Sequence, residues 1–317
     1  MLFSLSFGCQ KDNTKESISQ GVEKSVESSQ ASPQALRLKV LHYNICGNVC
    51  WESTDAPSGG VDTRGSVSRM ATILTAIDNN TPHLITFNEI CYSQYRNIRA
   101  DLIARGYGST YSSSMTGGQC DDYDSSWGTG FGDAIFYKGT VPSVQQKYLL
   151  PPSPSDVALG RNLQLLCVDV TFDGRQVKLC TTHVTTDAAY RPAQIQDIAD
   201  RAATWIAAGI PVVITGDFNA IPTDPVMDKM YSHSGGTGNF QEADESNSCP
   251  SPLTFCQAGE RTFGEVGHYY NPAYVEKKLD YIFFSAAHFT TPNGDAKSAF
   301  PTPISDHNLY VGDANLP

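Results

Sequence analysis

The dipeptide Asp173-Gly174 constrains the fold more than any other feature of the sequence. It separates two alternating apolar runs, "LLCVDVTF" and "RQVKLCTTH", and Asp-Gly between such runs is the strongest short-range signal of a β-hairpin. With these two residues as the turn, Cys167 faces Cys180 at a non-hydrogen-bonded position, where side chains approach most closely. We therefore predict an antiparallel strand pair that carries a Cys167–Cys180 disulfide.

Strands and helices alternate along the rest of the chain. The patterns predict strands at 36–44, 83–90, 132–138, 277–285 and 306–313 and within 212–222, helices at 66–80, 92–107 and 188–209, a long surface loop at 108–130, a turn region at 151–156 and a loop insertion at 234–256. Alternating elements combined with a tight hairpin favour a mixed α/β layered fold over a purely parallel sheet.

The first 34 residues differ in composition from the remainder. "MLFSLSFGCQ" is apolar as far as Cys9, and the polar, Ser-rich stretch that follows lacks the apolar side chains of a core. This pattern predicts a lipoprotein-type export signal with Cys9 as the lipidated residue and a membrane tether, then a disordered linker over 1–34. An ordinary ragged N-terminus is the alternative, and the folded domain is expected over 35–317.

Nine cysteines are many for a cytosolic enzyme, and none forms a C-x-x-C pair. Cys249 and Cys256 lie close together and are predicted to pair. Besides Cys9, the hairpin pair and the Cys249–Cys256 pair, four cysteines remain and can form two more bridges, with the pairing left open: Cys46, Cys50, Cys91 and Cys120. Such bridges indicate an oxidising compartment, so we expect a secreted or cell-envelope protein.

A net charge of −11 argues against a broad basic face that grips nucleic acid. It does not exclude an enzyme that meets a phosphate through a bound cation, because the ion inverts the local charge. The composition therefore leaves metal-assisted phosphate chemistry open.

Polar groups gather at the ends of the predicted strands. They are Asn44, Glu89, His183, Asp217 with Asn219, Asp280, and Asp306 with His307. Singly, each has an ordinary structural explanation; Asp217 and Asn219, for example, suit a turn in which they cap their own backbone. Their shared position is more informative, because rigid strand ends commonly carry catalytic groups.

The motifs "LHYN", "FNEI", "TTH", "GDFNAIP", "KLDYIFFS" and "SDHNLY" resemble, as an ordered set, the endonuclease/exonuclease/phosphatase superfamily, which has the fold of pancreatic-type deoxyribonuclease. The resemblance covers roughly Leu36 to Gly312. It implies a four-layered α/β sandwich of two packed mixed β-sheets flanked by helices, with the site at one end of the sheets.

The resemblance also implies roles for the residues that match its motifs. Glu89 is expected to bind a divalent cation, Mg²⁺ first and Mn²⁺ or Ca²⁺ as alternatives, with Asn44 and Asp306 completing or flanking the metal site. Asp217 would accept a proton from, or orient, the attacking water, and Asn219 would hold that water or a phosphate oxygen. Two histidines would contact the phosphate, with Asp280 fixing the tautomer of the second: His183 and His307.

Two departures from the family pattern, and two features beside them, lead to further expectations. The family's usual Gln-Glu is Asn88-Glu89 here, and the shorter amide is expected to weaken a supporting hydrogen bond. The family's substrate-side aromatic has no clear match, and Phe131, which lacks a hydroxyl, is a candidate for that place. Asp133 beside it could support the site, but an ordinary strand-edge acid is the preferred expectation. A Cys46–Cys91 disulfide could hold the two strand ends together.

The leading hypothesis is an exported, metal-dependent phosphodiesterase that cleaves DNA or RNA as a monomer. A sphingomyelinase or inositol-phosphatase type of phosphoesterase is the second, and the aromatic segment 267–274 could serve a lipid substrate. A non-catalytic binding module with this fold is the third, and it is disfavoured because every expected polar position is filled. The sequence leaves the choice among nucleic acid, lipid and inositol phosphate open, as it does the cleavage polarity.

Overall fold

The computed structural model of the chain describes residues 36–47, 67–115, 120, 130–141, 145–245, 257–264, 276–297 and 305–317. Residues 35–317 form one compact unit. The expectations for Cys9, for the Cys249–Cys256 pair and for the aromatic segment 267–274 lie outside the described residues. No helix in the described part is long and apolar enough to cross a membrane.

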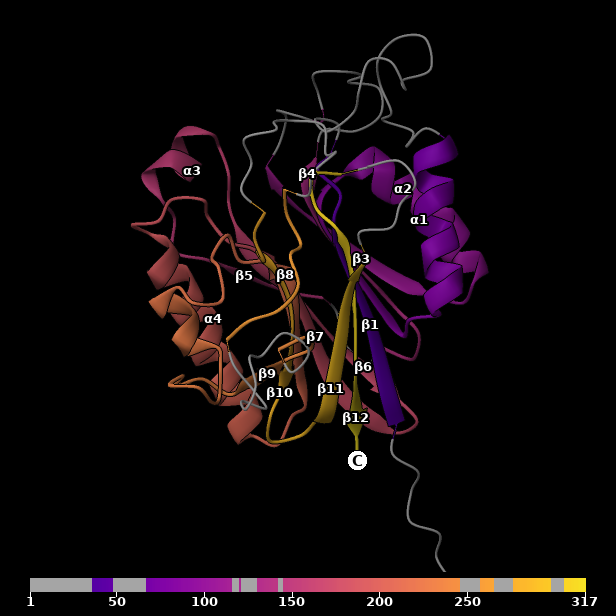
Figure 1. Ribbon diagram of the computed structural model, residues 1–317. Coiled ribbons are helices and arrows are strands. Elements are labelled where there is room, and N and C mark those ends of the chain that lie inside the picture. The colour runs from indigo at the N-terminus through magenta and orange to yellow at the C-terminus, as the bar shows by residue number, and fades with distance from the viewer. Residues whose placement is uncertain are drawn as a thin grey trace, which may run out of the picture. The chain divides into compact units, whose positions relative to one another are not determined.

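Two six-stranded mixed sheets form the centre of the fold (Figure 1). The first has the order β11-β12-β1-β2-β4-β3 and consists of β1 (Leu36–Asn44), β2 (Leu84–Cys91), β3 (Gly108–Met115), β4 (Phe131–Tyr137), β11 (Thr290–Lys297) and β12 (Leu309–Leu316). The second has the order β5-β6-β7-β8-β10-β9 and consists of β5 (Gln146–Leu149), β6 (Gln164–Phe172), β7 (Arg175–His183), β8 (Val212–Asp217), β9 (Phe240–Glu242) and β10 (Asp280–Ser285). The predicted mixed α/β sandwich is confirmed.

Helices cover the outer face of each sheet. Helices α1 (Val67–Asn80) and α2 (Tyr92–Ala104) lie on the first sheet and α4 (Arg191–Ala207) on the second, as Figure 1 shows. Ile73 of α1 and Ile98 of α2 pack on Phe87, and Ile198 of α4 packs on the core beneath the second sheet. A third apolar cluster fills the space between the sheets, so four layers enclose three cores.

The pairing directions explain why the functional residues meet. Strands β1 and β2 run parallel, and so do β7 and β8, so each pair presents its C-terminal ends at one edge. Asn44 lies beside Asn88, and His183 lies beside Asp217. Strand β10 is antiparallel to β8 and starts there, with Asp280 opposite Asp217.

The hairpin has the predicted register and disulfide. Cys167 faces Cys180 across β6 and β7, with their Cα atoms 4.1 Å apart. Because the closed loop is short, the chain-entropy model assigns this bond about 2–3 kcal/mol of stability. Cys91 bonds Cys120, with Cα atoms 5.6 Å apart. Two disulfides fit an extracellular protein.

The Cys91–Cys120 bond shows that the suggested Cys46–Cys91 pair is wrong. That suggestion assumed regular alternation along β2, but the register between Phe87 and Ile90 shifts at a β-bulge. Cys91 instead packs with Met115, Cys120 and Phe131.

The sequence analysis missed four strands, and all four are sheet edges. Strands β3 and β11 bound the first sheet and β5 and β9 bound the second. The surface loop predicted for 108–130 is therefore wrong over β3, whose sequence GSTYSSSM carries small polar residues because an edge strand buries little. The turn predicted at 151–156 contains the start of the short helix α3 (Pro154–Ala158), and the loop insertion contains β9.

Candidate active site

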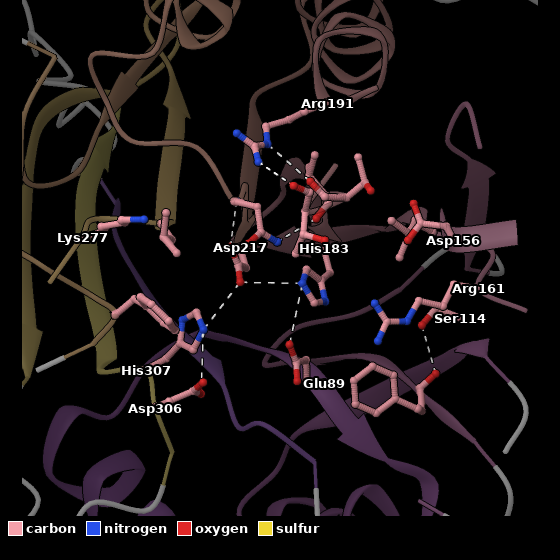
Figure 2. Close-up of a pocket in the computed structure, with 18 residues that line it drawn as sticks. Glu89, Ser114, Asp156, Arg161, His183, Arg191, Asp217, Lys277, Asp306 and His307 are labelled. Atoms are coloured by element: carbon pink, nitrogen blue, oxygen red, sulfur yellow. Dashed lines mark hydrogen bonds and ion pairs between the residues drawn. The ribbon is translucent and has the colours of Figure 1, made fainter. Parts of the chain in front are cut away.

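A pocket of about 460 Å³ opens where the strand ends meet (Figure 2). Six of the eight predicted site residues line it: Glu89, His183, Asp217, Asn219, Asp306 and His307. The other two, Asn44 and Asp280, are fully buried behind the lining. The structure therefore brings all eight into one constellation.

Glu89 reaches the pocket because of the β-bulge in β2. Asn88 and Glu89 fall in the register shift between Phe87 and Ile90, and Glu89 takes a left-handed backbone conformation with φ of 55°. A non-glycine residue in this region is strained, and such strain concentrates at functional sites. Burial raises the pKa of Glu89, and the negative charge of Asp306 raises it further.

Asn44 holds two carboxylates in place. Its Nδ2 donates to Glu89 Oε1 at 3.2 Å and to Asp217 Oδ2 at 3.2 Å. Its Oδ1 accepts a hydrogen bond from the Cys46 backbone N–H at 3.0 Å. With its oxygen used in this way, Asn44 flanks the site and orients the two acids.

Asp217 lies at the centre of the constellation. Its Oδ2 is 3.6 Å from His307 Nε2 and 3.7 Å from His183 Nε2. Burial and the nearby Asp280 raise the pKa of Asp217 to about 6. The preceding Gly216 is required, because a Cβ there would lie 2.0 Å from the Thr182 carbonyl oxygen.

Asn219 follows Asp217 in a tight turn. Its backbone N–H donates to Asp217 Oδ1 at 2.8 Å, and its Nδ2 donates to the Val184 carbonyl at 2.8 Å. The turn that explained Asp-Phe-Asn as ordinary structure is thus present, and it also fixes both side chains at the pocket wall.

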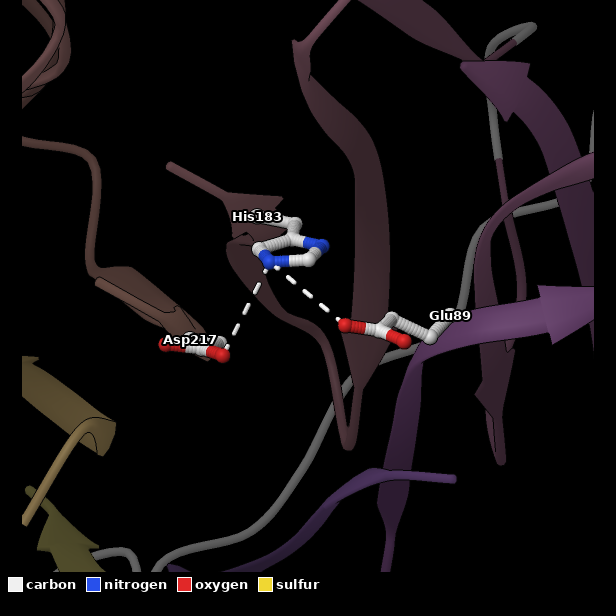
Figure 3. Close-up of side chains that lie close together, drawn as sticks. All are labelled: Glu89, His183 and Asp217. Atoms are coloured by element: carbon white, nitrogen blue, oxygen red, sulfur yellow. Dashed lines mark ion pairs between the residues drawn. The ribbon is translucent and has the colours of Figure 1, made fainter. Parts of the chain in front are cut away.

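His183 bridges the two carboxylates that face each other across the sheets. Its Nε2 lies 3.7 Å from both Glu89 Oε1 and Asp217 Oδ2 (Figure 3). Burial lowers the pKa of His183. A neutral imidazole keeps one donor and one acceptor nitrogen at this position.

His307 and Asp280 form the predicted hydrogen bond. His307 Nδ1 lies 2.6 Å from Asp280 Oδ2. Burial opposes charge on both groups, but their mutual attraction outweighs it, so the pKa of His307 is raised and that of Asp280 is lowered. The charged form of His307 is therefore favoured, and its ring lines the pocket.

His42 is a functional neighbour that the sequence analysis missed. Its Nε2 lies 3.2 Å from Asp280 Oδ1, and its Nδ1 lies 2.9 Å from Thr86 Oγ1. It shares a strand face with Asn44, two residues later, and that alternation was the available signal. Asp280 is thus held by one histidine on each of its carboxylate oxygens.

One expectation about the support of the site is wrong. Asp133 is not a strand-edge acid: it is 2% exposed, and it accepts hydrogen bonds from Asn88 at 2.7 Å and from Gln164 at 3.1 Å. Asn88 makes several hydrogen bonds: its Nδ2 donates to Asp133 Oδ1 at 2.7 Å, and its Oδ1 accepts from the Asp217 N–H at 3.0 Å. The expectation that its shorter amide weakens this support stays a prediction.

The donor set at this edge fits a hard divalent cation. One ligand atom from each of Glu89, His183 and Asp217 lies within 4.8 Å of the others. Glu89 and Asp306 repel each other without a cation between or beside them. Two of the three donors are carboxylates, whose oxygens are the ligands that Mg²⁺ prefers.

The pocket wall also contains residues that the sequence analysis did not single out. They include Arg161, Arg191, Phe263 and Lys277, while the predicted aromatic Phe131 is present. Lys277 directly precedes the motif "KLDYIFFS", but the other three lie away from the motifs, so no spacing in the sequence points to them.

The fold and the site agree with a family assignment. The model of the Endonuclease/Exonuclease/phosphatase family matches residues 41–307. The chain belongs to this family, which places it among phosphoester hydrolases of the nuclease and phosphatase type. The family is generally dependent on divalent metal. No curated protein matches the sequence.

Solved structures share the fold at low sequence identity. The human Nocturnin catalytic domain is 20% identical, with 90% of this chain and 97% of that chain covered and a TM-score of 0.61. An endonuclease/exonuclease/phosphatase from Bacteroides vulgatus is 16% identical, with 89% and 100% covered and a TM-score of 0.62. D. rerio TDP2 complexed with a single-strand DNA product is 13% identical, with 89% and 99% covered and a TM-score of 0.60.

Proposed function

We propose that the protein is an exported, divalent-metal-dependent phosphodiesterase that hydrolyses nucleic acid. The observation that carries this proposal is the His307–Asp280 pair, 2.6 Å apart, beside the Asn44-held carboxylates of Glu89 and Asp217. It sets a cation, a base and a metal-binding acid around one pocket, which are the groups that phosphoryl transfer needs.

Glu89 and Asp306 would hold the divalent cation, with Asn44 flanking them. When bound there, the cation polarises the phosphoryl oxygen and neutralises developing charge. Asn44 keeps Glu89 oriented through its 3.2 Å hydrogen bond, so the ligand is placed before the metal arrives. Mg²⁺ is the proposed ion, because the set is built on carboxylates.

Asp217 is the proposed base. Its Oδ2 faces both histidines, and its raised pKa places it near the range in which a carboxylate accepts a proton from water. Asn219 lies two residues away and holds the water or a phosphate oxygen. His183 donates to a non-bridging oxygen, and the His307 cation stabilises the charge that develops on the phosphoryl group.

Nucleic acid is proposed as the substrate, and export as the setting. A structural neighbour, D. rerio TDP2, is described with a single-strand DNA product, which supports a phosphodiester of this kind. The lipoprotein-like start at Cys9 and the two disulfides support export, with the chain acting as a monomer.

A substrate panel at equal enzyme concentration tests the proposal. Plasmid DNA, RNA, sphingomyelin and inositol phosphates are each incubated with Mg²⁺, and phosphate-ester cleavage is measured. We expect nicking or degradation of plasmid DNA or RNA and no comparable release from the other two. Clear release from sphingomyelin or an inositol phosphate, with intact nucleic acid, would contradict the nuclease assignment.

A further inference from the structure

Among the described residues, three cationic side chains besides the histidines line the pocket, and they differ in the contacts that they make. Arg191 is held by the protein: its Nη2 donates to the Thr186 carbonyl at 3.0 Å, and its Nη1 lies 3.6 Å from Asp224. Lys277 is exposed to solvent. Of these three, Arg161 is partly buried and its side chain makes no hydrogen bond or ion pair within the described residues.

The backbone at Arg161 is anchored on both sides. The Arg161 N–H donates to the Asp156 carbonyl of α3 at 2.8 Å, and the Asn162 N–H donates to the Ser114 carbonyl of β3 at 2.7 Å. These two bonds tie the segment between α3 and β6 to two different elements. The fold therefore sets the position of the Arg161 backbone at the pocket wall.

The Arg161 side chain itself has no partner in the described part of the chain. Its Nε is buried and makes no hydrogen bond, and no carboxylate there forms an ion pair with it. A buried donor without a partner is costly, and a guanidinium in a pocket is suited to a bidentate anion such as phosphate. An incoming ligand group would satisfy it.

Figure 2 shows the Arg161 guanidinium turned into the pocket, beside His183 and Glu89 and across from His307. Arg161, His183 and Glu89 thus line the same part of the pocket wall. If the phosphoryl group that is cleaved lies between His183 and His307, Arg161 faces the substrate group adjacent to that phosphoryl group.

We propose that Arg161 is a specificity residue that binds a second phosphoryl group of the substrate, adjacent to the phosphodiester that is cleaved and on the side away from His307. This inference rests on the proposed function, and it narrows the substrate to chains or compounds with neighbouring phosphates. An adjacent phosphate of a nucleic-acid strand meets this requirement, whereas an isolated phosphodiester does not.

Matched chromogenic substrates test the proposal. Thymidine 3′-(4-nitrophenyl phosphate) is compared with the same compound carrying a 5′-phosphate, and the corresponding 5′-(4-nitrophenyl phosphate) pair covers the other polarity. We expect KM to be about tenfold or more lower for the phosphorylated member of one pair, the range of a charge-assisted hydrogen bond. In Arg161→Gln the two KM values should agree within about twofold.

Two further variants separate the contact from general charge and from folding. Lys277→Gln removes an exposed cation of the same pocket and should keep the KM preference. Arg161→Lys keeps the charge without the planar fork and should show a reduced preference. Thermal unfolding of each variant checks that it is folded. A wild-type enzyme with no preference in either pair, or Arg161→Gln that retains it, would overturn the proposal.

A binding measurement keeps this test independent of turnover. Calorimetry with thymidine 3′,5′-bisphosphate and with each thymidine monophosphate should give wild-type affinity about tenfold or more higher for the bisphosphate, and Arg161→Gln should lose the difference. Absence of turnover with this discrimination intact would count against the proposed phosphodiesterase and support the subsite. Equal affinities for all three nucleotides would overturn the subsite alone.

Discussion

Replacing His307 with alanine is expected to lower kcat by about a thousandfold, within the range that a positioned proton donor or acceptor contributes. His307 Nε2 lies 3.6 Å from Asp217 Oδ2, and the side chain is only 5% exposed, so its truncation removes a positioned charged group from the pocket wall. Steady-state hydrolysis with Mg²⁺ measures the effect. His288→Ala is the matched control, since this histidine lies outside the pocket and should leave the rate near the wild-type value.

A double-mutant cycle shows whether Asp280 acts through His307. Asp280→Asn is expected to lower kcat strongly alone and to add little once His307 is alanine, because groups that act as one unit are non-additive. Their 2.6 Å contact is the physical reason. Rate losses that simply multiply in the double variant would show that the two residues act separately.

Glu89→Gln is expected to raise the Mg²⁺ concentration for half-maximal activity about a hundredfold and to lower kcat at saturation. The amide has the size of the carboxylate but loses the anionic charge, and loss of even a residue that only orients a ligand costs about 10–100-fold in metal affinity. Mg²⁺ titration of the rate measures this shift. Glu260 is an exposed glutamate outside the pocket, so Glu260→Gln should show the same Mg²⁺ dependence as wild type. An unshifted Mg²⁺ titration of Glu89→Gln would show that Glu89 does not bind the metal.

The central strands could be predicted because each carries a clear local signal, either a long apolar run or the Asp-Gly turn of a hairpin. "LRLKVLHYN" and "VVITGD" are apolar because both faces of their sheets are covered, and Asp173-Gly174 fixed the register of β6 and β7. The edge strands could not be predicted in this way. The β3 sequence GSTYSSSM satisfies its hydrogen bonds along one side only and needs few apolar residues.

The site was predictable as far as it depends on strand ends. Parallel pairing brings Asn44 to Asn88 and His183 to Asp217, so polar residues that end these strands must meet. Sequence patterns do not show where a β-bulge interrupts the alternation of a strand and reorients a side chain. The bulge that turns Glu89 into the pocket and the burial of Asp133 both depend on the register between β2 and β4.

Sequence patterns also could not identify pocket residues in loops, because long-range contacts place these residues. Arg161 is placed by backbone hydrogen bonds to Asp156 and Ser114, which lie in two other elements. Neither partner has a distinctive spacing from Arg161 in the sequence. The alternation with Asn44 on one strand could have indicated that His42 faces the site. Its contact with Asp280 could not be predicted, because Asp280 is 238 positions away.

The most direct test of metal-assisted hydrolysis at this site uses bis(4-nitrophenyl) phosphate with wild type and Asp217→Asn. Each protein is stripped with excess chelator, assayed, and assayed again after Mg²⁺ is restored, with release of 4-nitrophenol as the measurement. We expect no wild-type turnover in chelator, full recovery with Mg²⁺, and a rate about 10²–10⁴-fold lower for Asp217→Asn at saturating Mg²⁺. Full turnover in excess chelator, or an Asp217→Asn rate equal to wild type, would contradict it.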